Sequence, residues 1–149
     1  MITTLISSLI SICMASISNT ELLIILPVAL ILLAIMYVAL PNKTEIKESK
    51  VCISSIYGHN IRLQDIKAVE LAETLPKIRL RSGGLTLGPI RKGIFILEDL
   101  GQCQLYLNGD YSPYLLLRTY KDEIIILNCS DSEHTRALYH TIRQHIAKR

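Results

Sequence analysis

The sequence predicts a mainly β (α+β) domain of about seven strands, with an apolar membrane anchor before it and an amphipathic helix after it. Three observations support this fold class. Of 16 basic and 13 acidic residues, only Glu21 precedes Lys43. From residue 51 onward, apolar and polar residues alternate with the period of a strand, between turn residues. From residue 130 the period becomes helical. We therefore expect an anchor over 1–41, a linker over 42–50 and a domain over 51–149.

The anchor contains a stretch of nineteen residues, 22–40, without a charge. A helix of this length spans about 28 Å, close to the hydrocarbon thickness of a bilayer. Residues 2–17 are also uncharged, and two interpretations stay open for them. They form a second membrane helix that makes a hairpin with the first, or they are a cleaved signal peptide. The absence of a basic residue near their start favours the hairpin.

The flanks of the anchor predict its orientation. Lys43, Lys47 and Lys50 follow it closely, whereas residues 1–21 contain no lysine or arginine. Basic flanks stay on the cytoplasmic side of a membrane. The sequence therefore predicts a protein of the cell (inner) membrane with its C-terminal domain in the cytoplasm.

Strands are expected at seven places after a charged linker (KTEIKESK, 43–50). Their predicted ranges are 51–57, 61–72 with a break around Gln64-Asp65, 77–82, 93–98, 103–107, 114–120 and 124–129. Asn108-Gly109 is a strong hairpin dipeptide, so we expect it to join two paired strands. The glycines of SGGLTLGPIRKG (82–93) are interpreted as a flexible connection between strands.

The last element is a helix that closes the β core. Ser130 and Glu133 have the spacing of a capping box, which predicts the helix start. One apolar stripe follows at helical spacing. Its members are Thr135, Leu138, Tyr139, Ile142 and Ile146.

This order of elements, together with several short motifs, resembles a bacterial pleckstrin-homology (PH) domain. The motifs are DIKAVELAETLPKIRLR (65–81), GIF (93–95), LYL (105–107), SPY (112–114) and IILNCSDSEHT (125–135). The resemblance covers about two thirds of the chain. It implies a curled antiparallel sheet or open barrel of PH-like fold, capped by the terminal helix and associated with a membrane. It implies no reaction, and lipid binding would follow from it only by analogy of fold.

One basic run is the candidate binding site. In a regular strand, Ile78 and Leu80 would enter the core while Lys77, Arg79 and Arg81 line the outer face. The next loop adds further basic residues, and no acidic residue lies between Glu73 and Glu98. The complete candidate set is Lys77, Arg79, Arg81, Arg91 and Lys92. Its ligand would be anionic lipid headgroups or an acidic protein surface. The alternative is a solvated strand face, or an edge that charge protects from aggregation.

Other kinds of site find little support in the sequence. No catalytic residues, cofactor-binding motif or metal-ligand spacing can be singled out, so we expect no enzyme activity, no cofactor and no metal. The net charge of residues 43–149 is too small to predict nucleic-acid binding. The cysteines are interpreted as small core residues in a reducing compartment. Four tyrosines would line a peptide groove or the rim of the core; these are Tyr106, Tyr111, Tyr114 and Tyr120.

The sequence thus predicts a membrane-tethered, non-enzymatic binding or scaffolding module at the cytoplasmic membrane surface. Its partner would be a second copy of the chain, another protein or lipid headgroups. The alternative function is an accessory subunit of a membrane transporter or enzyme complex.

Overall fold

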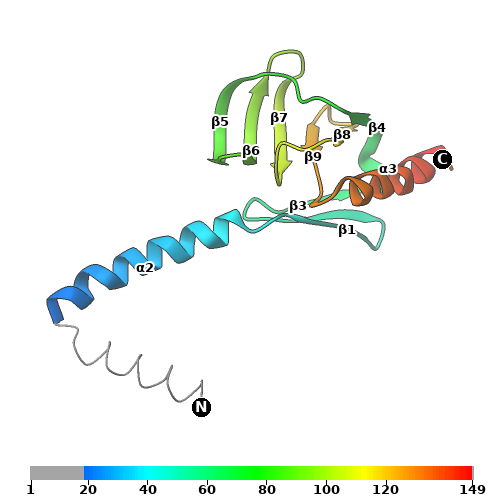
Figure 1. Ribbon diagram of the computed structural model, residues 1–149. Coiled ribbons are helices and arrows are strands. Elements are labelled where there is room, and N and C mark those ends of the chain that lie inside the picture. The colour runs from blue at the N-terminus through cyan, green and yellow to red at the C-terminus, as the bar shows by residue number, and fades with distance from the viewer. Residues whose placement is uncertain (1–18, 149) are drawn as a thin grey trace. The chain divides into compact units, whose positions relative to one another are not determined.

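A long helix, α2 (Asn19–Ala39), forms the N-terminal part of the computed structural model, which describes residues 19–148 (Figure 1). The chain divides into two units after Val38, and each is described by itself. Thr20–Tyr37 has a mean hydropathy of 2.4 and no buried residue, so among the described helices α2 alone is long and apolar enough to cross a membrane. The helix predicted over 22–40 is confirmed, whereas the prediction for residues 2–17 lies outside the described residues.

The second unit begins with an antiparallel sheet of β1 (Lys43–Lys47), β2 (Lys50–Ser54) and β3 (His59–Arg62). The prediction of a linker over 42–50 is therefore wrong. Thr44 is buried opposite Ile53, and half-buried Ile46 lies opposite Val51, while the charged residues of β1 are exposed. The β1–β2 turn has positive φ at both Glu48 (47°) and Ser49 (63°). Such turns usually carry Asn-Gly, so this one gave no signal in the sequence.

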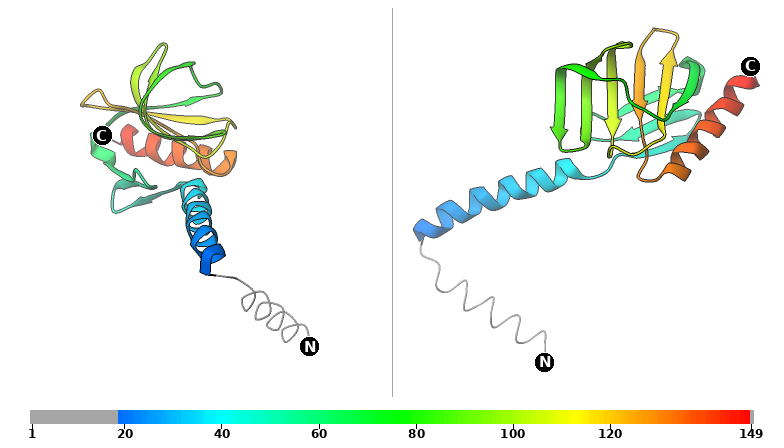
Figure 2. Two further views of the ribbon diagram at one scale, coloured as in Figure 1. Left: turned by 90° about the vertical axis from the view of Figure 1, so that its left-hand side faces the viewer. Right: turned by 45° about the horizontal axis from the view of Figure 1, so that its top comes forward.

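A second sheet has six strands in the order β4-β8-β9-β7-β6-β5, and it is not closed into a barrel (Figures 1 and 2). The 3₁₀ turn η1 (Leu63–Asp65) leads into it from β3 and confirms the predicted break. The strands of this sheet are β4 (Ile66–Ala72), β5 (Ile78–Leu87), β6 (Ile90–Leu97), β7 (Gly101–Leu107), β8 (Tyr114–Thr119) and β9 (Ile124–Leu127).

The hairpin predicted at Asn108-Gly109 does not form. Strand β9 lies between β7 and β8, antiparallel to β8 and parallel to β7. Its residues explain this central position. Ile125 and Leu127 are buried in one apolar cluster and Ile126 in another, on the opposite face. A strand that is apolar on both faces is most stable inside a sheet with both faces covered.

The two faces of the six-stranded sheet build two cores. One core lies between the sheet, the three-stranded sheet and the terminal helix, and includes Val51, Leu117 and Ile142. The other lies on the concave side of the curled sheet, and includes Phe95 and Leu116. The curl is visible in the left-hand view of Figure 2. Both clusters form without a disulfide, since Cys52, Cys103 and Cys129 are free thiols.

Helix α3 (Ser132–Ala147) ends the described chain and packs on β4, η1 and β8. The predicted stripe is confirmed, because Thr135, Leu138 and Ile142 are buried, with Tyr139 and Ile146 against the same core. The predicted cap is wrong by one residue. Asp131 is the N-cap, and its side chain accepts a hydrogen bond from the His134 N–H at 2.6 Å. The mainly β fold class with an apolar helix before it and an amphipathic helix after it is thereby confirmed.

Candidate functional site

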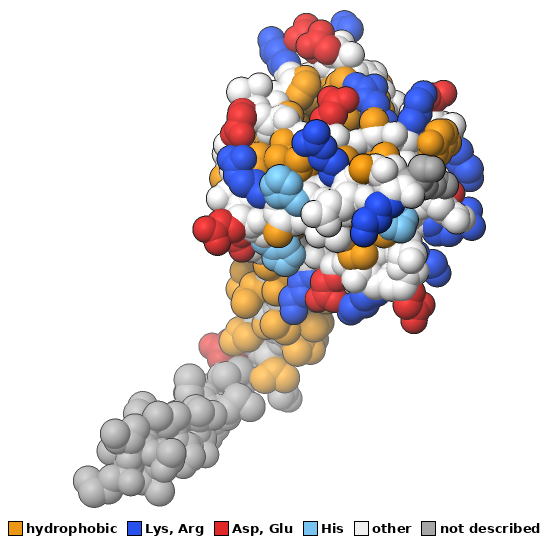
Figure 3. All heavy atoms as spheres, turned by 90° about the vertical axis from the view of Figure 1, so that its right-hand side faces the viewer, with side chains coloured by type: hydrophobic (Ala, Val, Ile, Leu, Met, Phe, Trp, Pro, Cys, Tyr) orange, Lys and Arg blue, Asp and Glu red, His pale blue; other side chains and the backbone are white. Residues whose placement is uncertain are grey.

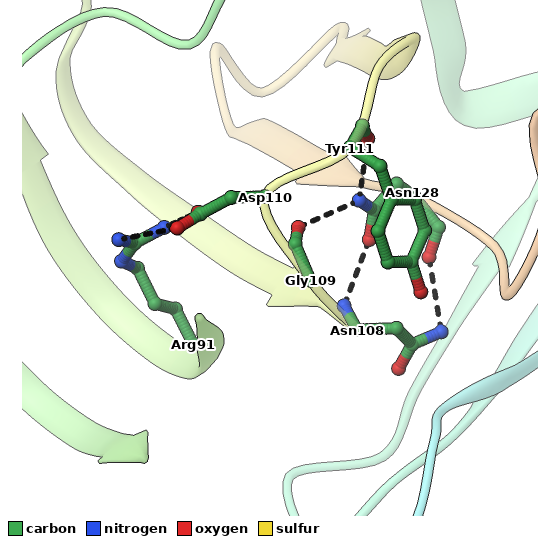
Figure 4. A network of polar contacts seen from close by, with 6 residues as sticks. All are labelled: Arg91, Asn108, Gly109, Asp110, Tyr111 and Asn128. Atoms are coloured by element: carbon green, nitrogen blue, oxygen red, sulfur yellow. Dashed lines mark hydrogen bonds and ion pairs between the residues drawn. The ribbon is translucent and has the colours of Figure 1, made fainter. Parts of the chain in front are cut away.

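Two asparagines at strand ends hold the loop that follows β7. The Asn128 side chain, 1 % exposed, donates from Nδ2 to the carbonyls of Gly109 (2.9 Å) and Tyr111 (3.0 Å). Its Oδ1 accepts from the Asn108 N–H at 2.8 Å (Figure 4). A hairpin loop would be held by the ladder of its own strands, but β7 and β8 are not paired. The amide of Asn128 replaces that ladder.

Arg91 belongs to the same region of the surface. Its guanidinium forms an ion pair with Asp110, whose second carboxylate oxygen lies 3.5 Å from the other guanidinium nitrogen (Figure 4). The Arg91 side chain is only 22 % exposed. Because an acidic neighbour already compensates its charge, Arg91 is a weaker ligand for an anion than the sequence indicates.

Lys92 lies inside the domain rather than on its surface. The residue is 1 % exposed, and its Nζ donates to the Leu40 carbonyl at 2.6 Å. Burial lowers the pKa of this ammonium from its ordinary value. The position of Lys92 in the sheet explains its burial. It lies opposite Tyr106, whose side chain belongs to the core between the two sheets and the terminal helix. The expectation that Lys92 belongs to an exposed basic surface is therefore wrong.

The basic run at the start of β5 does not line one face, and Lys77 precedes the strand that carries Arg79 and Arg81. Lys77, Arg79 and Arg81 are all exposed, and none forms an ion pair within residues 19–148. Register shifts interrupt the pairing with β6 between Ile78 and Leu80 and again between Arg81 and Gly83.

These shifts also correct the prediction for Leu80, which is 59 % exposed instead of entering the core. A bulge adds one residue to a strand and so changes the face that the next side chains occupy. Ile78 lies opposite Leu97, a core residue, whereas Leu80 lies opposite Ile96. The five candidate residues therefore do not form one site. Lys77, Arg79 and Arg81 are exposed, Arg91 is paired with Asp110, and Lys92 is buried.

The side of the domain that carries α3 has no surface of one charge. Figure 3 shows basic and acidic side chains interspersed there, with histidines between them. Within residues 19–148 no group of three His, Cys, Asp or Glu residues is placed to hold a metal ion. The predicted tyrosine group is divided, because Tyr106 and Tyr114 are buried while Tyr111 and Tyr120 are exposed.

A cavity of about 440 Å³ lies between the β2–β3 loop and the outer strands of the six-stranded sheet. Ile56 and Tyr57 of the loop form one wall, and Gly83, Gly84 and Ile94 contribute to the other. The sequence did not indicate this site, because its two walls are far apart in the chain. The prediction of a flexible connection at Gly83 and Gly84 is wrong, since both belong to β5.

The loop wall of this cavity is held by a hydrogen bond. The Tyr106 hydroxyl, which lies on β7, donates to the Tyr57 carbonyl at 2.9 Å. A tyrosine hydroxyl is protonated at neutral pH and can donate, and burial raises the pKa of Tyr106 further. This hydrogen bond joins the loop wall to strand β7.

No protein-family model, no curated protein and no solved structure matched this chain.

Proposed function

We propose that this protein is a membrane-tethered, non-enzymatic module that binds or scaffolds a partner at the cytoplasmic surface of the cell membrane. The observation that carries the proposal is helix α2, which leads directly into a folded β domain. Its large apolar side chains are exposed, at between 46 % and 74 % for the leucines and isoleucines from Leu22 to Ile35.

Exposure of this kind disfavours water as the surroundings of α2. Burial of one Leu or Ile side chain contributes about 1.5–3 kcal/mol, and α2 exposes many of them on all sides. A hydrocarbon environment removes that penalty, and the backbone of a helix satisfies its own hydrogen bonds there. A signal sequence has the same composition. The proposal differs from that alternative because it requires the helix to remain in the mature protein.

The basic residues after α2 support a cytoplasmic domain. Lys43, Lys47 and Lys50 are exposed on β1 and at the start of β2, and they follow the apolar segment in the chain. The free thiols of the domain agree with a reducing compartment. The resemblance to bacterial PH domains is part of the proposal too, supported by a curled sheet followed by a terminal helix.

Fractionation and topology reporters test the proposal on the full chain. We expect the protein in the membrane fraction after washes with high salt and alkaline carbonate, at the mass of the uncleaved chain. A C-terminal green fluorescent protein fusion should be fluorescent, and a C-terminal alkaline phosphatase fusion inactive. A soluble or shortened chain, or an active phosphatase, would contradict the proposal. Co-purification of a transporter or enzyme at equal stoichiometry in mild detergent would favour the accessory-subunit alternative instead.

A further inference from the structure

We propose that the uncharged half of β5, residues 83–87, is a docking edge for an extended acidic segment of a partner protein. This inference rests on the proposed binding function and names the class of partner. Strand β5 is the last strand of the six-stranded sheet, so only one of its sides is paired, with β6. An open edge presents backbone donors and acceptors to an added strand.

The two halves of β5 differ in how well their open edge is protected from pairing with another strand. The first half carries Arg79, Arg81 and both register shifts. Charges and bulges are devices by which proteins protect an edge from pairing. From Gly83 to Leu87 the strand pairs residue for residue with Ile94 to Ile90, without a shift, a charge or a proline. This second half therefore lacks the protection of the first.

The cavity lies beside the unprotected half. Gly83 and Gly84 border it from β5, and neither places a side chain in it. Three of its apolar side chains are partly exposed, Ile56 at 44 %, Tyr57 at 46 % and Ile94 at 37 %. Side chains of an extended segment alternate between the two faces of a sheet. An added strand would thus pair with the backbone of β5 and insert alternate apolar side chains into this cavity.

The basic residues beside the docking edge favour a partner segment that is acidic. Arg79 and Arg81 precede the docking edge on the same strand, and Lys77 comes just before that strand; none of the three is neutralised by an ion pair within residues 19–148. An acidic stretch beside an apolar alternating stretch complements both halves of β5. A second copy of the chain fits less well, because its own β5 region offers no acidic residue between Glu73 and Glu98 to meet these cations. A lipid headgroup would engage the cations but leave the strand edge and the cavity unused.

The chain offers matched variants for a test. A Cβ at Gly83 would meet no atom within 4 Å, and its φ is not in the left-handed region, so side chains are tolerated there. Gly83→Glu places a carboxylate at the mouth of the cavity, and Gly83→Ala is its control. Arg79→Glu with Arg81→Glu reverses the charge beside the edge. Lys67→Glu with Lys121→Glu makes the same change at two exposed residues elsewhere.

The experiment uses the full chain in nanodiscs of neutral lipid. Random dodecapeptides displayed on phage are selected on it and counter-selected on empty nanodiscs. We expect enriched peptides with Asp or Glu at one end and alternating apolar residues at the other. Synthetic copies should protect the amides of residues 83–87 from hydrogen exchange. Their affinity should fall at least tenfold with Gly83→Glu or the β5 charge reversal, and less than twofold with either control. Each variant is first checked for wild-type thermal stability.

The proposal is overturned by a lack of enrichment over empty nanodiscs, by peptides without acidic residues, or by protection elsewhere. It is equally overturned if Gly83→Glu binds as Gly83→Ala does. Self-association that the β5 variants abolish would assign the edge to a second copy. Binding to anionic vesicles, but to no peptide, would assign the cations to lipid. None of these outcomes alters the fractionation result, so failure of the docking edge is distinct from failure of the membrane-tethered module.

Discussion

Asn108 holds the backbone of Asn42 through both atoms of its carboxamide. Its Oδ1 accepts from the Asn42 N–H at 2.5 Å, and its Nδ2 donates to the Asn42 carbonyl at 3.1 Å. The same Nδ2 lies 3.2 Å from the Asn128 carbonyl. Three segments therefore meet at Asn108, namely the residue before β1, the end of β7 and the end of β9. The start of the β domain is thus joined to its central strands.

Substitution of Asn128 tests how much this network stabilises the domain. Asn128→Ala leaves the Asn108 N–H and the carbonyls of Gly109 and Tyr111 without their partner, in a site that is buried at Gly109 and part-buried at the other two. We expect the free energy of unfolding to fall by about 2–3 kcal/mol. Pulse proteolysis of the full-length protein in urea measures it. Asn60→Ala, at an exposed position of β3, is the control and should change stability by less than about 0.5 kcal/mol. Equal effects would show that the network contributes nothing.

A second prediction tests whether residues 43–47 act as a structural strand or as a linker. Replacement of KTEIK by Gly-Ser-Gly-Ser-Gly removes the inward side chains of Thr44 and Ile46, together with the preference of β1 for an extended conformation. We expect a loss of more than about 3 kcal/mol or complete unfolding, seen as loss of protease resistance. As a control, Gly-Ser in place of the exposed turn Lys121-Asp122 should leave resistance intact. An unaffected β1 variant would restore the linker interpretation.

Helix α3 provides a comparison of two adjacent residues. Asp131→Ala removes the side chain that caps the helix, so stability should fall by about 1 kcal/mol. Ser130→Ala should be within about 0.5 kcal/mol of wild type, because Ser130 is exposed and precedes the cap. The measurement is the urea midpoint of each variant. A larger effect at Ser130 than at Asp131 would reverse the assignment.

We expect ionisation of the buried Cys103 thiol to lower the stability of the domain in alkali. Burial raises the pKa of its thiol from 9.0 to about 11, an effect that the positive charge of Arg118 partly opposes. Between these values the folded chain keeps the proton and the unfolded chain releases it, so the free energy of unfolding falls as pH rises from about 9 to 11.

The comparison with Cys103→Val isolates this effect. The difference in stability between wild type and variant should be constant below about pH 8. It should then shift against the wild type by about 2 kcal/mol by pH 10.5, as follows from the two pKa values. Urea titrations in the presence of a reductant at pH 7, 8, 9, 10 and 10.5 measure it. Parallel pH profiles for the two proteins would refute the prediction.

Much of the fold follows from local patterns in the chain. The uncharged run in α2, the alternation in most strands and the stripe on α3 each depend on neighbours within a few residues. Strand β1 was missed because its turn, Glu48-Ser49, lacks the residues that usually mark one. The candidate site was predicted less well. Sequence spacing identified the basic residues, but it could not show the bulges that turn Leu80 outward or the burial of Lys92.

The order of residues alone predicts which part of this protein is apolar enough for a membrane, where most strands run and which face of the last helix is buried. Those properties arise from the periodicity and hydropathy of contiguous residues. No local pattern indicates that β9 separates β7 from β8, that Lys92 bonds to the Leu40 carbonyl, or that the β2–β3 loop and β5 line the same open cavity. Each of these depends on pairing between segments that are distant in the chain, and a shift of one residue in a strand exchanges its faces.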